Sequence, residues 1–404
     1  MKVAGANEYK QLCADSNNKS ASYYPVISPP VESRLDISKT MSYSVYRDHA
    51  VWITRDMKGY AIGDNSNGRI YGKMSLKKLN KEEEFIIYDN EGKPCDLFSA
   101  VCGQWYTLYM VQPQGATDYK LAYVAYNKNE GTPLFLDIGG RKPIGLFGGE
   151  SKAAAIDTKG AIIIITETLF DSPDQKPQSA GLSGNEQAVC LACCDCFIAA
   201  LSSNGRVYLS AMKKNDNKFS DFVEVPTLKG IKFTHISGTF EHCLAVSEDG
   251  RVFGIGSNCN GVLGLGSKLK KADKFREIKG LSNQKIKAAF AGFDESLFIT
   301  ENGKILSCGN NYCGQLLSAG HLGQESVFTP KETIIKEGAT FCIAGYGLSA
   351  VFVGLDPPPY SPNKIISTDL LITKKNAVAD FETQTQANVK NMTTESKVVA
   401  EVQS

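Results

Sequence analysis

The fold of this 404-residue chain is decided by the stretch that reads Glu241-His242-Cys243-Leu244-Ala245-Val246-Ser247-Glu248-Asp249-Gly250-Arg251-Val252-Phe253-Gly254-Ile255-Gly256-Ser257-Asn258. An apolar run, a polar turn that ends in Gly250 and a second apolar run form the pattern of a β-hairpin. A second copy starts at Gly292, turns at Gly303 and continues through Gly309. Two copies of one pattern predict a protein built from repeats.

Weaker copies appear when the turn glycines are aligned. Gly115, Gly160, Gly205, Gly250 and Gly303 follow one another at intervals of 45, 45, 45 and 53 residues. A first copy runs from residue 46 to 68 and has Met57 at the turn, and a half-copy covers residues 341–353. The missing half matches residues 3–12, so one repeat is split between the ends of the chain. Such a split closes a ring and removes an exposed sheet edge.

These motifs resemble the regulator of chromosome condensation family, whose repeat carries a Gly-x-x-His start, an Asp-Gly hairpin and a Gly-x-Asn-x-x-Gly-Gln-Leu-Gly end. The resemblance implies an all-β, seven-bladed β-propeller over residues 1–355, with the N-terminal segment pairing with the last blade. Its structural repeat positions in this chain are His49, Gly63, Gly103, Gly160, Gly205, His242, Gly250, Gly256, Gly303 and Gly309. This chain departs from the pattern at Glu295, where His is usual, and in the units around Gly115, Gly160 and Gly205, which keep only the turn.

Composition excludes several classes of function. Lys and Arg number 44 against 43 Asp and Glu, so no strong field attracts nucleic acid or an anionic membrane. The longest aliphatic stretch is far shorter than the ~18 residues of a membrane span. Twelve Cys residues, most of them in apolar runs, fit a reducing compartment. We therefore expect an intracellular monomer, cytoplasmic or nuclear, that binds neither nucleic acid nor membrane.

Two residue groups invite a chemical interpretation. Cys190, Cys193, Cys194 and Cys196 contain the spacing of half a zinc site, but no second ligand pair follows. Because the segment aligns with the innermost strand of a blade, we expect small buried side chains and neither metal nor cofactor. His49 and His242 lack a recurring acid or nucleophile, so we expect their ring nitrogens to bond the backbone of the neighbouring blade.

The sequence also suggests connecting segments and a binding surface. We expect surface loops at residues 76–84, 167–187 and 267–280, and a weakly ordered polar tail at residues 356–404. The third loop is rich in Lys and Arg, which fits a solvated loop better than a contact with an acidic protein surface or a phosphate. The candidate protein-binding residues are Lys268, Lys270, Lys271, Lys274, Arg276, Asn310, Tyr312 and His321.

No catalytic residue set emerges, which leaves two main hypotheses for function. The first is a protein-binding scaffold that uses the inter-blade loops around residues 257–279 and 310–322. The alternative, which the resemblance implies, is a guanine-nucleotide exchange factor for a Ran-type small GTPase, acting without covalent chemistry. In the family that activity depends on a protruding wedge, expected among the units around Gly115, Gly160 and Gly205. Since those units are eroded, we expect little exchange activity. An enzyme with its active site in the central channel is a third, weaker hypothesis, because converging His, Asp or Glu residues are missing.

Overall fold

A computed structural model describes residues 1–19, 25–65, 68–71, 78–125, 132–166, 168–171, 176–213, 218–318 and 326–359. The chain divides into Met1–Ile365 and Ile366–Ser404. The second part, and with it nearly all of the tail expected from residue 356 onward, lies outside the described residues. Within the described ranges, no helix has the length and apolar character needed to cross a bilayer.

Seven antiparallel sheets make up the fold, and each is one blade of a propeller. The first four blades are β4 (Thr40–Val45), β5 (His49–Thr54), β6 (Gly59–Asp64) and β7 (Lys78–Phe85); β8 (Cys95–Cys102), β9 (Tyr106–Pro113), β10 (Lys120–Ala125) and β11 (Leu134–Leu136); β12 (Pro143–Gly148), β13 (Ala153–Asp157), β14 (Ile162–Ile165) and β15 (Gln178–Ala180); and β16 (Ala188–Cys193), β17 (Phe197–Ser202), β18 (Val207–Ala211) and β19 (Val223–Glu224).

The other three blades are β20 (Phe233–Thr239), β21 (His242–Ser247), β22 (Val252–Ser257) and β23 (Lys271–Glu277); β24 (Ile286–Ala291), β25 (Glu295–Thr300), β26 (Ile305–Gly309) and β27 (Val327–Glu332); and β28 (Ala339–Ala344), β29 (Leu348–Val353), β1 (Lys2–Ala6), β3 (Pro25–Glu32) and β2 (Asn18–Lys19). Helical turns are short: α1 (Thr168–Asp171) and 3-10 turns at Ile37–Lys39, Ser183–Asn185, Pro226–Leu228 and Lys279–Leu281.

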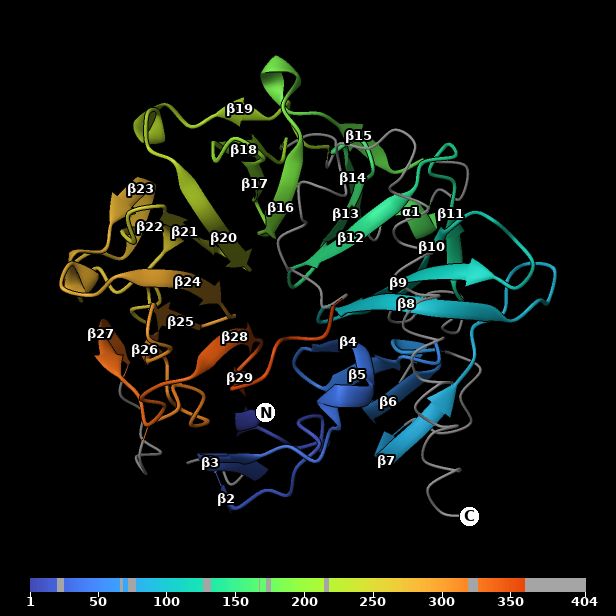
Figure 1. The fold of residues 1–404 in the computed structure, drawn as a ribbon, viewed down its shortest axis with the longest axis horizontal. Coiled ribbons are helices and arrows are strands. Elements are labelled where there is room, and N and C mark those ends of the chain that lie inside the picture. The colour runs from blue at the N-terminus through green and yellow to red at the C-terminus, as the bar shows by residue number, and fades with distance from the viewer. Residues whose placement is uncertain are drawn as a thin grey trace, which may run out of the picture. The chain divides into compact units, whose positions relative to one another are not determined.

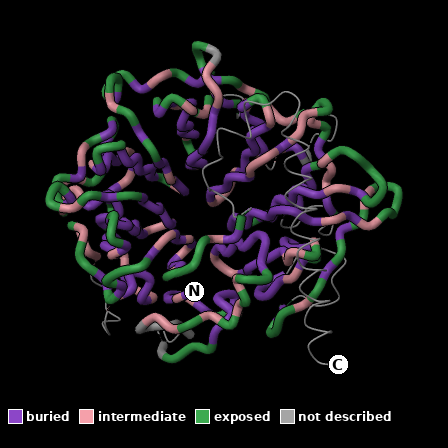
Figure 2. The backbone as a smooth tube through the Cα atoms, in the orientation of Figure 1, coloured by how far each residue is buried: buried purple, intermediate pink, exposed green. Residues whose placement is uncertain are grey.

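The blades stand in a ring with the first strand of each nearest the axis, as Figure 1 shows for β8, β12, β20, β24 and β28. The first three strands of most blades are almost wholly buried, and exposed residues gather in the loops and outer strands (Figure 2). Side chains of neighbouring blades pack face to face, so apolar surface is buried between the sheets. The predicted seven-bladed all-β propeller is confirmed.

The ring is closed by the first strand of the chain. β1 lies between β29 and β3, and its register with β29 pairs Val3 with Ala350 and Gly5 with Leu348. On its other edge, Val3 pairs with Val31. Pairing on both edges leaves neither β1 nor β29 with unpaired backbone groups facing solvent. The closure predicted from the split repeat is therefore confirmed.

Three-residue turns join the second and third strands of the repeats. In each turn the amide of the third residue donates to the carbonyl three positions earlier, as in Gly160 to Asp157 and Gly250 to Ser247, both at 2.9 Å. The third residue has positive φ, between +73° and +85° at Gly160, Gly205, Gly250 and Gly303, which favours glycine. Met57 adopts the same conformation at φ 64°. Gly115 also has positive φ but lies in a longer connection between β9 and β10.

The expectation of surface loops at residues 76–84, 167–187 and 267–280 is wrong in part. Residues 78–85 form β7, residues 178–180 form β15 and residues 271–277 form β23, each the fourth strand of a blade. A fourth strand pairs on one edge only and faces solvent, so its sequence is polar. In β23, for example, only Ala272 and Phe275 are buried. Exposed charges on such an edge discourage pairing with other chains.

Candidate protein-binding face

One face of the propeller carries all the connections that join first to second and third to fourth strands. First and third strands run in the same direction within a blade, so both end at this face. We call it the loop face, and its inner loops are residues 46–48, 103–105, 149–152, 194–196, 240–241, 292–294 and 345–347. The outer loops join third to fourth strands. The opposite face, with the three-residue turns, is the turn face.

In the blades that keep the repeat motif, a glycine fastens the inner loop to the end of the third strand. Gly63, Gly256 and Gly309 have φ of +114°, +103° and +113°. A Cβ atom on Gly256 would lie 2.0 Å from the carbonyl oxygen of Glu241, so only glycine permits the close approach. The next amide, that of Ser257, donates to the same carbonyl at 2.9 Å. Gly103 lies instead inside an inner loop, against the Tyr106 ring.

The repeat histidines join neighbouring blades, as predicted, but through hydroxyl groups rather than backbone atoms. His49 Nε2 lies 3.0 Å from Thr107 Oγ1, and that hydroxyl donates to the Arg69 carbonyl at 2.9 Å. His242 makes the same contact with Ser296. Burial lowers the pKa of His49 and of His242 to about 3, so both rings are neutral and serve the packing of the ring.

Glu295 stands where the next repeat would carry histidine. Its side chain is fully buried, and neither carboxyl oxygen makes a hydrogen bond to a described residue. Burial, reinforced by neighbouring Asp294, raises the pKa of this carboxyl well above its usual value. Burial therefore favours the neutral form of this carboxyl group. The next blade nevertheless keeps the hydroxyl that matches Thr107 and Ser296. It belongs to Ser349, whose Oγ donates to the Gln315 carbonyl at 2.9 Å.

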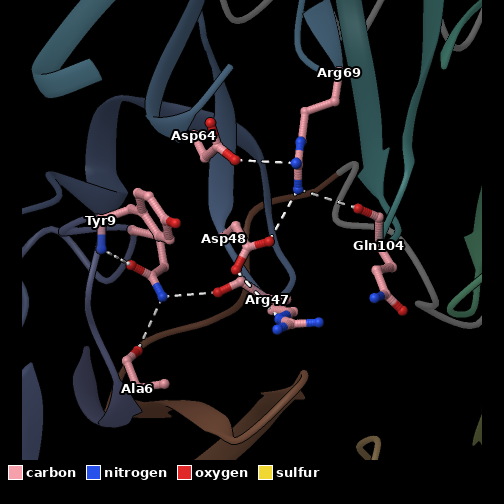
Figure 3. Close-up of polar contacts among 8 residues, drawn as sticks. Ala6, Tyr9, Arg47, Asp48, Asp64, Arg69 and Gln104 are labelled. Atoms are coloured by element: carbon pink, nitrogen blue, oxygen red, sulfur yellow. Dashed lines mark hydrogen bonds and ion pairs between the residues drawn. The ribbon is translucent and has the colours of Figure 1, made fainter. Parts of the chain in front are cut away.

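A buried arginine ties an inner loop to an outer loop (Figure 3). Arg69 donates to Asp48 Oδ2 at 2.9 Å, approaches Asp64 Oδ2 at 3.0 Å, and reaches the Gln104 carbonyl of the next blade at 3.4 Å. Its guanidinium also lies 5.5 Å from the centre of the Trp105 ring. One cation between two carboxylates fixes the tips of two blades relative to each other.

Gln11 ties the blade that contains β1 and β29 to the blade of β4–β7, and Figure 3 draws its contacts with Ala6, Tyr9 and Arg47. Gln11 Nε2 donates to the Ala6 carbonyl at 3.1 Å and to the Arg47 carbonyl at 2.8 Å, while its oxygen accepts from the Tyr9 amide at 3.0 Å. Gln315 plays the matching part in its own blade, donating to Asp294 Oδ1 at 3.3 Å. The loop face is thus held rigid by side chains that the repeat places in register.

Aromatic rings form an arc along three inner loops. The Phe240 and Phe293 rings stack at 4.2 Å between centroids, and Phe293 and Tyr346 lie 4.1 Å apart. The Arg47 guanidinium covers the Tyr346 ring at 4.6 Å and extends the arc to a fourth blade. All four residues are partly exposed. Half-exposed aromatic rings with an arginine are typical of protein interfaces.

Two acidic side chains lie in inner loops of blades that do not contribute to the aromatic arc. Glu150 and Asp195 lie in adjacent inner loops, joined by a 2.7 Å hydrogen bond from Ser151 Oγ to Asp195 Oδ1. Burial, with Asp195 adding to it, raises the pKa of Glu150 to about 7. With its amide turned to suit both neighbours, Gln104 donates to Glu150 and accepts from Arg47 Nη1 at 3.1 Å. Glu150 can therefore change charge near neutral pH.

The binding residues expected from the sequence do not lie together in the structure. Asn310 and Tyr312 lie in an outer loop of the loop face, where Asn310 donates to Asp294 Oδ2 at 2.7 Å. Lys268 and Lys270 also lie in an outer loop, but Lys271, Lys274 and Arg276 lie on β23 at the rim. The expectation that those three residues lie in a loop is wrong, because β23 is an exposed fourth strand with a polar sequence. His321 lies outside the described residues, as do residues 126–131, 172–175 and 214–217 of the region in which a wedge is expected.

The cysteine cluster lies on and just after the innermost strand β16. Cys190, Cys193 and Cys194 are buried, and Cys196 is exposed at the tip of an inner loop. Cys194 Sγ lies 3.3 Å from the His242 carbonyl of the next blade, close to Gly238. Burial raises the pKa of the Cys190 and Cys193 thiols to about 12. Such protonated thiols pack as small apolar groups.

Sequence analysis missed the aromatic arc, the acidic pair and the Arg69 cluster. A usable signal was present, because Phe240, Phe293 and Tyr346 each follow a repeat glycine by one or two residues. Aligning the copies at those glycines places all three residues at inner-loop tips. The acidic pair gives no comparable signal, since its units have lost most of the motif.

Comparisons with known proteins agree with this architecture. The regulator of chromosome condensation (RCC1) repeat matches residues 233–262, 286–315 and 249–299. The Bos taurus secretion-regulating guanine nucleotide exchange factor is 35% identical over 99 residues, which are 24% of this chain and 20% of that protein. The X-linked retinitis pigmentosa GTPase regulator of Canis lupus familiaris is 37% identical over 95 residues, 24% of this chain and 9% of that protein. The similarity thus spans a fifth or less of these relatives.

Solved structures resemble the whole propeller. Human WBSCR16 superposes with a TM-score of 0.67 at 13% identity, over 87% of this chain and 98% of that chain. Prp20p of Saccharomyces cerevisiae, a protein studied for its binding to Gsp1p and histones, gives 0.64 at 14% identity, over 87% and 90%. At these identities the likeness shows the fold. Together with the repeat matches at residues 233–315, it supports a divergent β-propeller that is similar to the proteins of the regulator of chromosome condensation family.

Proposed function

We propose that this protein is an interaction scaffold that binds a protein partner through the inner loops of the loop face. The observation that carries the proposal is the aromatic arc of Phe240, Phe293 and Tyr346, completed by Arg47. These groups offer a partly exposed apolar and cationic surface on a rigid base. Large rings lose little side-chain entropy on binding, so such residues commonly supply most of an interface's affinity.

The surroundings of the arc favour recognition over chemistry. Among the described residues, His49 and His242 are buried, neutral and used between blades. Glu295 is fully buried, so its carboxyl group is not open to a substrate at the surface of the loop face. The described residues contain no group of three or more His, Cys, Asp or Glu that could hold a metal ion. A binding surface accounts for the half-exposed rings without requiring a reaction.

Capture of partners from a native extract tests the proposal. Tyr346→Ala removes a ring of the arc, and Tyr88→Ala removes an exposed ring near the turn-face end of β7 as the matched control. We expect a partner bound by the wild type and by Tyr88→Ala to be lost or weakened at least tenfold by Tyr346→Ala, with all three proteins equally folded. A partner set unaffected by Tyr346→Ala would contradict the proposal.

The alternative function is nucleotide exchange on a small GTPase. It is favoured by the relative named as a guanine nucleotide exchange factor and by the fold shared with Prp20p. Release of a fluorescent guanine nucleotide from a Ran-type GTPase, with catalytic amounts of this protein, distinguishes the two. We expect binding without accelerated release, because the blades with eroded repeats are the ones that would have to hold a wedge in place. A large acceleration would establish the alternative.

A further inference from the structure

A cavity opens at the turn face, and none of the residues that line it belongs to the aromatic arc. Its volume is about 730 Å³, and it lies at the starts of β20, β24 and β28, beside the hairpin turns that follow β21 and β25. This volume falls within the range of about 300–1,000 Å³ that is usual for sites of small molecules. Since inner loops and hairpin turns lie at opposite ends of the strands, this cavity is independent of the proposed partner surface.

The floor of the cavity is aromatic and apolar. It is formed by Phe290, Phe341, Ile286, Ala288 and His235, all of them buried. The Phe290 ring meets the His235 ring edge-on at 5.1 Å and the Phe341 ring at 4.9 Å. Edge-to-face packing leaves flat ring surfaces that a planar apolar ligand can cover.

His235 adds an unused polar group to this floor. The side chain is 7% exposed, and its Nδ1 atom makes no hydrogen bond to a described residue. Burial lowers the pKa of His235 to about 4, so the ring is neutral. A neutral imidazole has one donor and one acceptor nitrogen. The Nδ1 atom is itself buried, so the neutral ring contributes to the floor of the cavity without bringing a charge into it.

The rim of the cavity carries one uncompensated positive charge. Glu248 pairs with Lys232 at 3.1 Å, and Lys285 pairs with Glu301 at 2.5 Å. Lys287, which also lines the cavity, is exposed and makes no ion pair with a described residue. The ammonium group of Lys287 therefore remains available to an anion at the edge of an aromatic floor.

We propose that this cavity is a binding site for a small aromatic carboxylate. The rings of the ligand would cover Phe290 and Phe341, and its carboxylate would pair with Lys287. Its apolar floor supplies contact area, and the single cation selects acids over their uncharged analogues.

Calorimetric titration of the full chain with 2-naphthoate and with uncharged 2-naphthalenemethanol tests this proposal. We expect the acid to bind three- to tenfold more tightly than the alcohol. Lys287→Gln should abolish that preference, and Lys268→Gln, which alters a lysine of the loop face, should retain it. Ala288→Leu fills the floor and should weaken both ligands at least tenfold. An unchanged unfolding midpoint separates this effect from misfolding.

The opposite results would overturn the proposal. Absence of binding by the wild-type chain up to about 5 mM, where ligands of this size bind in apolar sites, would mean that the cavity is not such a site. Equal affinities for acid and alcohol, or an equal loss of preference in Lys268→Gln, would remove the role of Lys287. Unchanged binding by folded Ala288→Leu would place the ligand elsewhere.

Discussion

The imidazole of His242 and the hydroxyl of Ser296 join two blades through one short contact, 3.0 Å between Nε2 and Oγ. The hydroxyl donates onward to the Val262 carbonyl at 2.6 Å, so the imidazole N–H must be the donor to it. Three groups from two blades thereby satisfy one another in a site without solvent. Ser296→Ala leaves both of its partners unpaired and is expected to cost about 1–3 kcal/mol.

Replacing the imidazole should change how stability depends on pH. In the folded protein the pKa of His242 is lowered to about 3, whereas an unfolded chain binds the proton near its usual value of about 6.5. The unfolded state therefore holds more protons between these two pH values. The contribution of His242 to the free energy of unfolding is thus full above pH ~6.5 and is lost as the pH falls toward 3.

We expect His242→Gln to be less stable than the wild type at pH 7.5, and the gap to shrink by up to about 1.4 kcal/mol per pH unit below 6.5. Urea unfolding at several pH values measures it. Ser296→Ala breaks the same contact and keeps the histidine, so its deficit should stay nearly constant. A pH-independent deficit in His242→Gln would show that the imidazole is not the source.

The Arg69 cluster should be sensitive to the shape of the cation as well as to its charge. Arg69→Met removes the cation that lies between Asp48 and Asp64, while Asp48 keeps its 3.4 Å ion pair with Arg47, and we expect a loss of about 3–5 kcal/mol. Arg69→Lys retains the charge but lacks the planar fork, so an intermediate loss is expected. Equilibrium unfolding of the three proteins tests the order, and a loss below about 1 kcal/mol for Arg69→Met would refute it.

The repeat glycine Gly256 is expected to tolerate no side chain. Gly256→Ala places Cβ 2.0 Å from the Glu241 carbonyl oxygen, whereas Gly266→Ala, also at positive φ, meets nothing within 4 Å. The control variant should show only backbone strain, about 1–2 kcal/mol. Gly256→Ala should cost at least about 2 kcal/mol more, because backbone atoms must move. Equal melting temperatures for the two variants would contradict this account.

Removing residues 1–13 should open the ring. The deletion exposes the edge of β29 and takes Leu12 and Cys13 out of the core, so we expect a lower melting temperature and self-association. Lys2→Ala removes only an exposed 2.8 Å ion pair with Glu32 and serves as the control, with little change expected. A monomeric deletion variant that melts like the wild type would be incompatible with closure by β1.

The sequence was enough to predict the propeller because its glycines repeat for geometric reasons. Gly250 and Gly303 are required by the hairpin turns, and Gly256 and Gly309 by the close approach of an inner loop. The fourth strands escaped prediction because β23 and its counterparts owe their conformation to one neighbouring strand. A strand paired on a single edge needs few apolar residues, and its sequence reads as a polar loop.

The candidate site was harder to predict for a different reason. Phe240, Phe293 and Tyr346 come from three repeats about 53 residues apart, and they meet only because the ring sets the inner loops side by side. The pKa of Glu150 is likewise raised by its burial between blades, to which Asp195 of the next blade adds. Sequence periodicity locates such tips, but not which tip stacks on which.

The position of β1 has a consequence for the order of events during synthesis. Val3 pairs with Ala350, which is made 347 residues later. Until then β1 has β3 as its sheet neighbour, a partner available after about 30 residues. The nascent chain must therefore keep one strand edge open while six blades form, and completion waits for the seventh. Chaperone dependence and aggregation of truncated chains should both be greatest during this interval.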